Sequence, residues 1–313
     1  MTGSPFVSAA WLDAALHSPC PPVVLDATLL LSRPRFDGDF RSSSGQPRWA
    51  EAHIPGSRHV AVDKDFSVPH ATHDHHPPPQ TLANRLAALG VSKADSVVAY
   101  DSVGGLWASR LWYLLDWIGI DARILDGGLT AWQAAGLPVV VGASEGSDGG
   151  RSGRGLLRRL GDAPAARWTV STTRQAWVDK DELVRRLGLG TTPPAPASAE
   201  VCLVCGLAEA VFDGTEPTRY SRRGHIPGSK NVPARGLFDE HGLVLSPAEV
   251  RAQYIAAGVD LDREILLYCG GGISACANAA ALAHAGLRRV RVYDGSLEEW
   301  SADPELPLLI GRA

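Results

Sequence analysis

The sequence predicts an α/β protein of two tandem domains, each an open, mostly parallel sheet with helices on both faces. Three observations support this fold class. The chain has 313 residues, more than a single hydrophobic core usually serves. It contains an internal repeat. Within each copy, short apolar runs alternate with helix-like segments, which is typical of parallel strands joined by helices.

The internal repeat consists of three blocks in the same order. The block His-Ile-Pro-Gly-Ser starts at His53 and again at His225, 172 residues later. An apolar run ends in Tyr-Asp101 in the first copy and in Tyr-Cys269 in the second, 168 residues later, and an Asp-Gly…Trp block recurs at that same distance. Solenoid repeats are roughly 20–50 residues long, so this period indicates that a whole domain is duplicated.

The repeat divides the chain into residues 1–140, expected to form the first domain, and 168–313, expected to form the second. Residues 141–167 between them are rich in Gly, Ser and Arg and are typical of a linker. A stretch rich in Pro, Ala and Thr at 190–199 predicts a surface loop inside the second copy.

Secondary structure follows from the apolar pattern. Short apolar runs suit buried parallel strands at 23–25, 97–100, 201–204 and 265–268. Helix-like segments lie at 80–89, 107–118, 247–257 and 275–285. In such sheets the reactive site lies at the carboxyl ends of the strands, and the chain should carry its chemistry there.

One strand end in the second copy has the features of a nucleophile site. Cys269 is followed by Gly270, Gly271, Gly272, Ile273, Ser274 and Ala275, and then by an Ala-rich helix. The glycines let the backbone aim several N–H groups at one point, and the helix adds the positive end of its dipole. We therefore expect Cys269 to have a lowered pKa and to be a thiolate. The alternative is a small buried residue that ends a strand. Asp101, at the equivalent point, predicts a catalytically silent first domain.

The two His-Ile-Pro-Gly blocks, the Asp-Gly…Trp blocks and the cysteine loop together resemble the tandem-domain rhodanese superfamily. The loop Cys-Gly-Gly-Gly-Ile-Ser-Ala-Cys is similar to that of 3-mercaptopyruvate sulfurtransferases. The resemblance implies a sulfurtransferase in which a small donor passes a sulfane sulfur to Cys269. The persulfide, held by residues 270–275, then gives the sulfur to a thiol or other nucleophilic acceptor, without a metal or cofactor. Phosphatases of this superfamily carry an arginine where Ala275 stands, which disfavours that activity.

The resemblance also implies an aspartate and a histidine from the first domain as proton donors to the leaving group. Their spacing matches Asp65 and His76, with His75 as a competitor for the second role. A solvated polar loop explains the histidine run 70–76 equally well, and a metal site there is less favoured than either.

The chain departs from the family pattern at the substrate site. Leu207 and Asp213 occupy the positions of the family's two carboxylate-binding arginines, and Gly271 replaces a loop serine. Leucine and aspartate cannot make the bidentate, charge-assisted bonds that a carboxylate favours. The donor is therefore either 3-mercaptopyruvate-like or altered. Three arginines downstream, Arg219, Arg222 and Arg223, could substitute, although three arginines in a loop more often form a solvated face.

Two further functions stay open from these residues. One is a sulfur-carrier protein of a specialised biosynthetic pathway, which holds a persulfide delivered by a partner and has little turnover of its own. The other is a redox module. Cys205, which replaces a family aspartate, is either a relay thiol for the Cys269 persulfide or a structural thiol. Cys202 and Cys276 are expected in the core, and Cys20 in a loop.

Composition excludes several classes of protein. The net charge is −4 and charged residues make up 20 %, which disfavours nucleic-acid and membrane partners, because both need clustered positive charge. No apolar run reaches the ~20 residues of a spanning helix, and the first residues lack the pattern of a signal peptide. Five cysteines are an odd and sparse count, so we expect reduced thiols in the cytoplasm.

Overall fold

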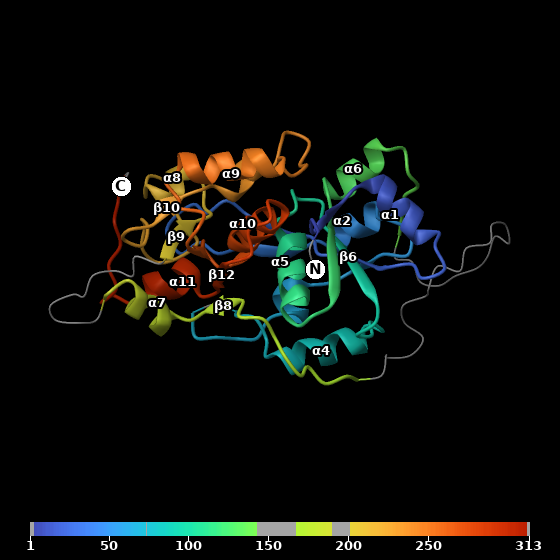
Figure 1. Cartoon of the computed structure of the whole chain (residues 1–313), viewed down its shortest axis with the longest axis horizontal. Helices are drawn as coiled ribbons and strands as arrows, with labels where there is room; N and C mark the ends of the chain where they lie inside the picture. Colours follow the sequence, from blue (N-terminus) through green and yellow to red (C-terminus); the bar gives the residue numbers. More distant parts are fainter. Residues whose placement is uncertain (1–2, 73, 143–166, 190–200, 312–313) are drawn as a thin grey trace.

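The computed structural model describes residues 3–72, 74–142, 167–189 and 201–311. They form two five-stranded parallel sheets flanked by helices (Figure 1). The strand order is β1-β7-β6-β2-β5 in the first sheet and β8-β12-β11-β9-β10 in the second, read from its β8 edge. Because the two orders correspond strand for strand, the second sheet repeats the first. The predicted fold class is confirmed.

The first sheet contains β1 (Phe6–Val7), β2 (Val23–Asp26), β5 (Arg58–His59), β6 (Ser96–Tyr100) and β7 (Asp121–Leu125). A small antiparallel hairpin joins β3 (Leu29–Leu31) to β4 (Ser42–Ser44). The helices of this half are α1 (Ala9–Leu16), α2 (Gln46–Glu51), α3 (Val62–Asp65), α4 (Pro79–Ala88), α5 (Leu106–Trp117) and α6 (Gly128–Ala134).

The second sheet contains β8 (Trp177–Val178), β9 (Val201–Cys205), β10 (Lys230–Asn231), β11 (Glu264–Tyr268) and β12 (Val290–Tyr293). Its helices are α7 (Lys180–Arg186), α8 (Glu209–Phe212), α9 (Pro247–Ala256), α10 (Ile273–His284) and α11 (Ser296–Ala302), with a 3-10 turn at Ala234–Leu237. The four predicted strands and four predicted helices are confirmed, with ends shifted by at most two residues. The predicted linker lies almost wholly outside the described residues, as does the predicted loop at 190–199.

The repeated His-Ile-Pro-Gly-Ser blocks have the same structural role in both halves. In the first, the Ser57 hydroxyl lies 2.9 Å from the hydroxyl of Tyr100, the last residue of β6. In the second, the Ser229 hydroxyl lies 2.7 Å from that of Tyr268, the last residue of β11. Each block thus anchors a turn to the strand that leads into the following loop, which explains why the blocks occur twice.

The two halves meet where α5 packs against α10, at the centre of the molecule (Figure 1). Arg110 of α5 is 1 % exposed and pairs with Asp294, which follows β12, at 2.5 Å. A buried charge needs a partner of opposite sign, so this ion pair fixes one half against the other.

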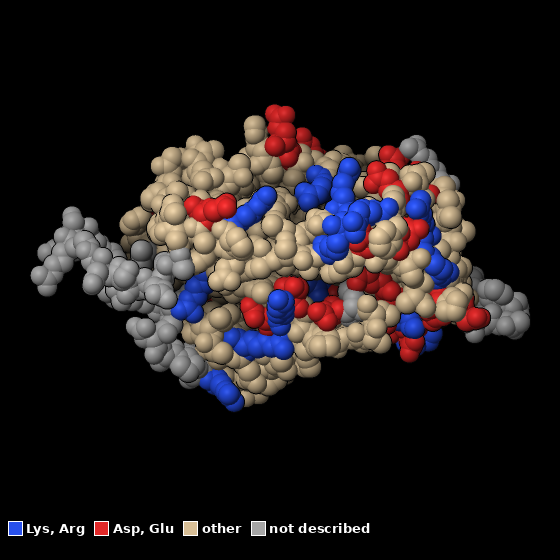
Figure 2. Space-filling view, turned by 180° about the vertical axis from the view of Figure 1, so that it is seen from behind, with Lys and Arg blue, Asp and Glu red and all other residues tan. Residues whose placement is uncertain are grey.

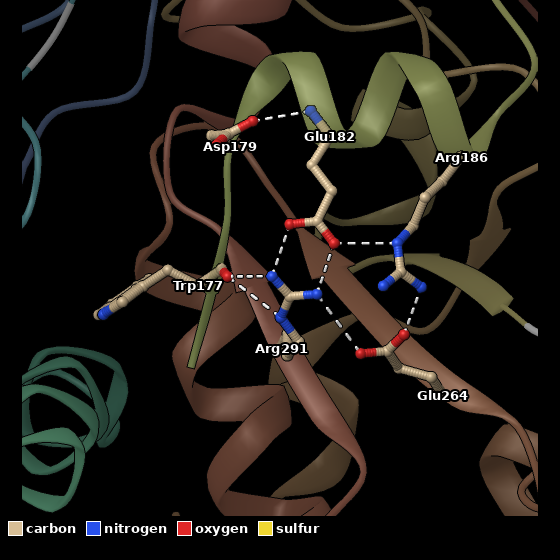
Figure 3. A network of polar contacts seen from close by, with 6 residues as sticks. All are labelled: Trp177, Asp179, Glu182, Arg186, Glu264 and Arg291. Carbon is tan, nitrogen blue, oxygen red and sulfur yellow. Dashed lines mark hydrogen bonds and ion pairs between the residues drawn. The ribbon is translucent and has the colours of Figure 1, made fainter. Parts of the chain in front are cut away.

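A second polar network closes the outer edge of the second sheet (Figure 3). Arg291 of β12 donates to both carboxylate oxygens of Glu182 in α7, at 2.6 and 2.7 Å, and to the Trp177 carbonyl. Arg186 bonds Glu182 and Glu264. Arg186 and Arg291 also line a cavity beside α7. Because both guanidinium groups are paired with carboxylates, neither is a free cation for a ligand in that cavity.

Charged side chains of both signs lie next to one another on the face drawn in Figure 2. Such mixing does not make the continuous basic stripe that binds nucleic acid. Among the described helices, none is long and apolar enough to cross a membrane.

Candidate active site

Cys269 lies directly after β11, at the start of the loop that leads into α10, and is 2 % exposed. Backbone N–H groups of Gly271, Gly272, Ser274 and Ala275 lie near its sulfur and act to lower the pKa of the thiol. Gly272 has φ +79°, a conformation that favours glycine. The loop backbone thus acts on the sulfur in the direction expected from its glycines, by favouring the anionic form.

The expectation that Cys269 has a lowered pKa is wrong. Burial raises the pKa of the thiol above its ordinary value, and the four N–H donors offset only part of that effect. The resting group is thus a neutral thiol at neutral pH. The same N–H groups would stabilise an anionic group at the position of the sulfur, because they can donate hydrogen bonds to it.

The first half shows the same kind of loop filled by an anionic group. The carboxylate of Asp101 accepts hydrogen bonds from the N–H groups of Val103 at 2.9 Å, Gly105 at 2.8 Å and Ala108 at 2.9 Å. Asp101 is 2 % exposed. A strand–loop–helix unit of this design therefore holds buried negative charge by backbone donors, and its copy at Cys269 has the same capacity.

Ser296, the first residue of α11, holds the backbone of Cys269. Its hydroxyl accepts the Cys269 N–H at 3.1 Å and donates to the Tyr293 carbonyl at 2.8 Å. Ser296 has φ +48° and is the one non-glycine with positive φ among the described residues. The repeat places Gly128, with φ +57°, at the equivalent position. Sequence reasoning missed Ser296, although a serine opposite a glycine in the aligned repeats was a readable signal.

Tyr220 lies against the cysteine loop. An added Cβ on Gly270 would lie 3.7 Å from its ring, and its buried hydroxyl has no hydrogen-bond partner among the described residues. Burial, with Cys205 and Cys269 as further causes, raises the pKa of the phenol well above its ordinary value. Tyr220 is therefore a neutral phenol beside Cys269, and no pattern in the sequence pointed to it.

Glu298 also contacts the loop, because its N–H donates to the Gly270 carbonyl at 2.8 Å. Burial raises the pKa of its carboxyl to about 7, although Arg219 acts in the opposite direction. Arg219 in turn interacts electrostatically with Glu298 and Tyr220. The surroundings of the Cys269 loop thus include a phenol, Tyr220, and a carboxyl, Glu298, that interacts electrostatically with Arg219.

Comparison with known families matches the model "Rhodanese-like domain" to residues 8–135 and 204–303. The chain belongs to the rhodanese family. A probable 3-mercaptopyruvate sulfurtransferase of Pseudomonas aeruginosa is 31 % identical over 319 aligned positions, which cover 99 % of this chain and 100 % of that protein. A thiosulfate/3-mercaptopyruvate sulfurtransferase of Arabidopsis thaliana is 30 % identical over 98 % of this chain and 78 % of its own. Both relatives are named as sulfurtransferases, which is the enzyme class expected from the sequence.

Solved structures agree on the tandem rhodanese fold. The anaerobic ergothioneine biosynthesis enzyme from Chlorobium limicola superposes with a TM-score of 0.76 at 20 % identity, over 98 % of this chain and 70 % of that one. YnjE superposes with a TM-score of 0.74 at 22 % identity, over 98 % and 68 %. At these identities the likeness concerns the fold alone.

The three arginines that follow Asp213 in the sequence, Arg219, Arg222 and Arg223, differ in what they contact. Arg222 donates to four backbone carbonyls in the segment 300–306. Arg223 pairs with Asp37 at 2.9 Å. Arg219 donates one N–H to the Ser32 carbonyl at 2.8 Å, while its buried Nε has no partner within the described residues. Of the three, Arg219 keeps a donor for a ligand.

Cys205 and Cys276 are buried and, like Cys269, are neutral thiols at neutral pH. Cys205 ends β9, in register with Tyr268 and therefore beside Cys269, but burial raises its pKa to about 12. Cys276 lies 3.7 Å from the Arg110 guanidinium in the core, and burial raises its pKa to about 12 as well. Cys205 thus has the location expected of a relay thiol, but it is not present as a thiolate at neutral pH.

His76 approaches the cysteine loop through its backbone. Its N–H donates to Asp294 at 2.7 Å, and an added Cβ on Gly272 would lie 2.6 Å from that carboxylate. The imidazole stacks on Trp177 with ring centres 4.3 Å apart. Burial lowers the pKa of His76, so the ring is neutral. The structure gives His76 the position of a support for the loop through Asp294.

Asp65 is exposed, and its carboxylate accepts the Ala61 N–H at 2.8 Å, which closes the first turn of its own helix. Within the described part of the chain, no hydrogen bond or ion pair joins Asp65 to Cys269. His75 instead stacks on His70, with ring centres 3.9 Å apart. Spacing alone did not reveal these partners, because they depend on how the loop 66–78 folds back on itself.

Proposed function

We propose that this chain is a sulfurtransferase that moves a sulfane sulfur from a small anionic donor, through a persulfide on Cys269, to a thiol or other nucleophilic acceptor. The observation that carries the proposal is the set of four backbone N–H groups around the Cys269 sulfur. The carboxylate of Asp101 in the equivalent loop supports it, since it is an anion held in the same way.

The reaction balances without an external oxidant or reductant. The Cys269 sulfur attacks the sulfur of a donor R–SH, a new S–S bond forms and the donor's C–S bond breaks. The electron pair leaves with carbon, which takes up the thiol proton, so the products are R–H and Cys269–S–SH. An acceptor thiol then attacks the outer sulfur, and Cys269 returns as a thiol. The N–H donors stabilise the anion that forms on sulfur in each step.

The negative charge of the donor needs a binding partner in the protein. Leu207 cannot bind a carboxylate, and Asp213 would repel one, so the arginine pair of the family has no equivalent at those positions. We propose that Arg219 binds the anionic group through its unpartnered Nε, and that the Tyr220 hydroxyl donates to the transferred sulfur. One cation in place of two predicts weaker binding of 3-mercaptopyruvate than the family pattern would give.

We further propose that residues 1–140 form a catalytically silent domain that supports 168–313, because Asp101 cannot act as a sulfur nucleophile. A persulfide enzyme and its thiol acceptor need a reducing compartment, and we propose the cytoplasm. Its partners would be a small sulfur compound and a thiol or protein acceptor.

Steady-state assays with 3-mercaptopyruvate and with thiosulfate, each with a thiol acceptor, test the proposal. Arg219→Gln should raise the KM for the anionic donor about tenfold or more, since a hydrogen bond to a charged group contributes about 1.5–3 kcal/mol. Arg223→Gln, which removes a neighbouring arginine already paired with Asp37, is the matched control and should leave KM unchanged. One bound sulfur per chain without repeated turnover would contradict the enzyme and point to a carrier.

A further inference from the structure

Three potential metal ligands lie together between the two halves of the molecule, outside the group of residues around Cys269. They are His70 and His75, from the loop before α4, and Glu299 of α11. One ligand atom from each lies within 4.8 Å of the other two. Two imidazoles and a carboxylate form a ligand set that zinc uses in proteins.

The loop that carries the histidines is folded so that they face each other. The backbones of Val68 and His75 form a short antiparallel bridge, with N–H to carbonyl distances of 2.8 and 2.9 Å. The imidazoles of His70 and His75 stack with ring centres 3.9 Å apart and an angle of 16° between the ring planes. The His70 Nδ1 also lies 3.5 Å from the Thr72 hydroxyl.

Glu299 is oriented by a residue behind it. The Tyr293 hydroxyl donates to Glu299 Oε2 at 2.8 Å, which leaves the second oxygen for a metal ion. Partners of this kind hold the ligands of known metal sites in place. Since the carboxylate comes from α11 and both imidazoles come from the loop 66–78, an ion bound to all three connects the two halves.

We propose that His70, His75 and Glu299 bind one divalent transition-metal ion, with Zn²⁺ as the best fit. Imidazole and carboxylate ligands favour Zn²⁺ over Mg²⁺ and Ca²⁺, which prefer oxygen alone. Zinc–ligand distances are about 2.0–2.2 Å, so the three side chains, whose ligand atoms lie within 4.8 Å of one another, would have to move closer together to bind the ion. This departs from the sequence-based expectation that the chain holds no metal.

The ion would influence the reaction indirectly, by restraining α11, because residues of α11 also hold the cysteine loop. The Leu297 N–H donates to the Cys269 carbonyl at 3.0 Å, and the Glu298 N–H to the Gly270 carbonyl. Fixing Glu299 to the loop 66–78 therefore restrains the first turn of α11. The site itself does not depend on persulfide chemistry, so its test is independent of the proposed function.

Calorimetric titration of ZnCl₂ into the full, untagged chain, previously dialysed against a chelator, measures binding directly. The proposal expects one Zn²⁺ per chain. His70→Ala and Glu299→Gln should each weaken binding about tenfold or more, and Co²⁺ in the same site should give the visible absorption of a low-coordinate N/O complex. His241→Ala is the matched control, because His241 is an exposed histidine beside Glu240, and it should bind Zn²⁺ like the unchanged chain.

Thermal unfolding provides a second measurement. Zn²⁺ should raise the melting temperature of the unchanged chain and of His241→Ala, and leave those of His70→Ala and Glu299→Gln in place. Circular dichroism of the metal-free variants establishes that they are folded. Absence of a one-to-one site in the unchanged chain, or equal Zn²⁺ affinity in folded His70→Ala, would overturn the proposal.

Discussion

Replacing Arg110 by methionine removes one partner of the ion pair that joins the two halves. At the 2.5 Å separation of Arg110 and Asp294, Coulomb attraction amounts to about 7 kcal/mol with an effective dielectric constant of about 20. Most of that energy offsets the cost of burying both charges. Arg110→Met leaves the Asp294 carboxylate buried, with the His76 N–H still donating to it. We expect the free energy of unfolding to fall by about 3–5 kcal/mol.

The dependence on pH has a definite sign. In the unchanged chain Arg110 holds the pKa of Asp294 below its ordinary value of 3.8. The pair therefore stabilises the fold fully above that value, and its contribution is lost as the pH falls below it. In Arg110→Met, burial dominates and raises the pKa of Asp294, so stability is instead lost as the pH rises. The difference between the two chains should be larger at pH 7 than at pH 4.

Urea unfolding followed by tryptophan fluorescence at both pH values measures these differences. The double variant Arg110→Met with Asp294→Leu is the control, because replacing both partners by apolar groups recovers much of the loss. A loss under ~1 kcal/mol for Arg110→Met at pH 7, or a double variant less stable than the single one, would refute the reasoning.

Three other predictions concern the loops. Gly272→Ala should slow sulfur transfer about tenfold or more, an effect of ~1.4 kcal/mol, because its Cβ would meet the Asp294 carboxylate at 2.6 Å; Gly228→Ala, with φ +77° and open space around it, is the matched control, and equal rates for the two would contradict the expected clash. Asp101→Ala should lower the free energy of unfolding by about 1–3 kcal/mol, since three buried or partly buried N–H groups lose their acceptor; unchanged urea unfolding would show that this loop does not need its anion. The raised pKa of Cys269 predicts that its alkylation by iodoacetamide, followed by mass spectrometry, accelerates with pH and is still rising at pH 9; a rate that levels off below pH 8 would show a thiolate instead.

Much of the fold could be predicted because the information is local or repeated. Apolar runs and helix-like segments gave the strands and helices, and aligning the two copies placed Asp101 opposite Cys269 at equivalent strand ends. The N–H cradle followed in the same way, since three consecutive glycines before a helix leave the backbone few alternatives.

The residues around the sulfur could not be predicted, because they come from distant elements. Tyr220 contacts the loop from the segment after α8, and Glu298 contacts it from α11 and interacts electrostatically with Arg219. The pKa of Cys269 depends on how deeply the strand end is buried, which the loop sequence does not encode. The positions of Asp65 and His76 depend on the fold of a loop without a repeat partner in the second copy.

The measurement that tests the account most directly is the intact mass of the chain after incubation with 3-mercaptopyruvate or thiosulfate and removal of the donor. The account predicts one added sulfur, mapped by peptide mass spectrometry to Cys269. The sulfur should be absent in Cys269→Ser, retained in Cys205→Ser and released by a thiol acceptor. No added sulfur from either donor, or a sulfur that persists in folded Cys269→Ser, would contradict the central claim.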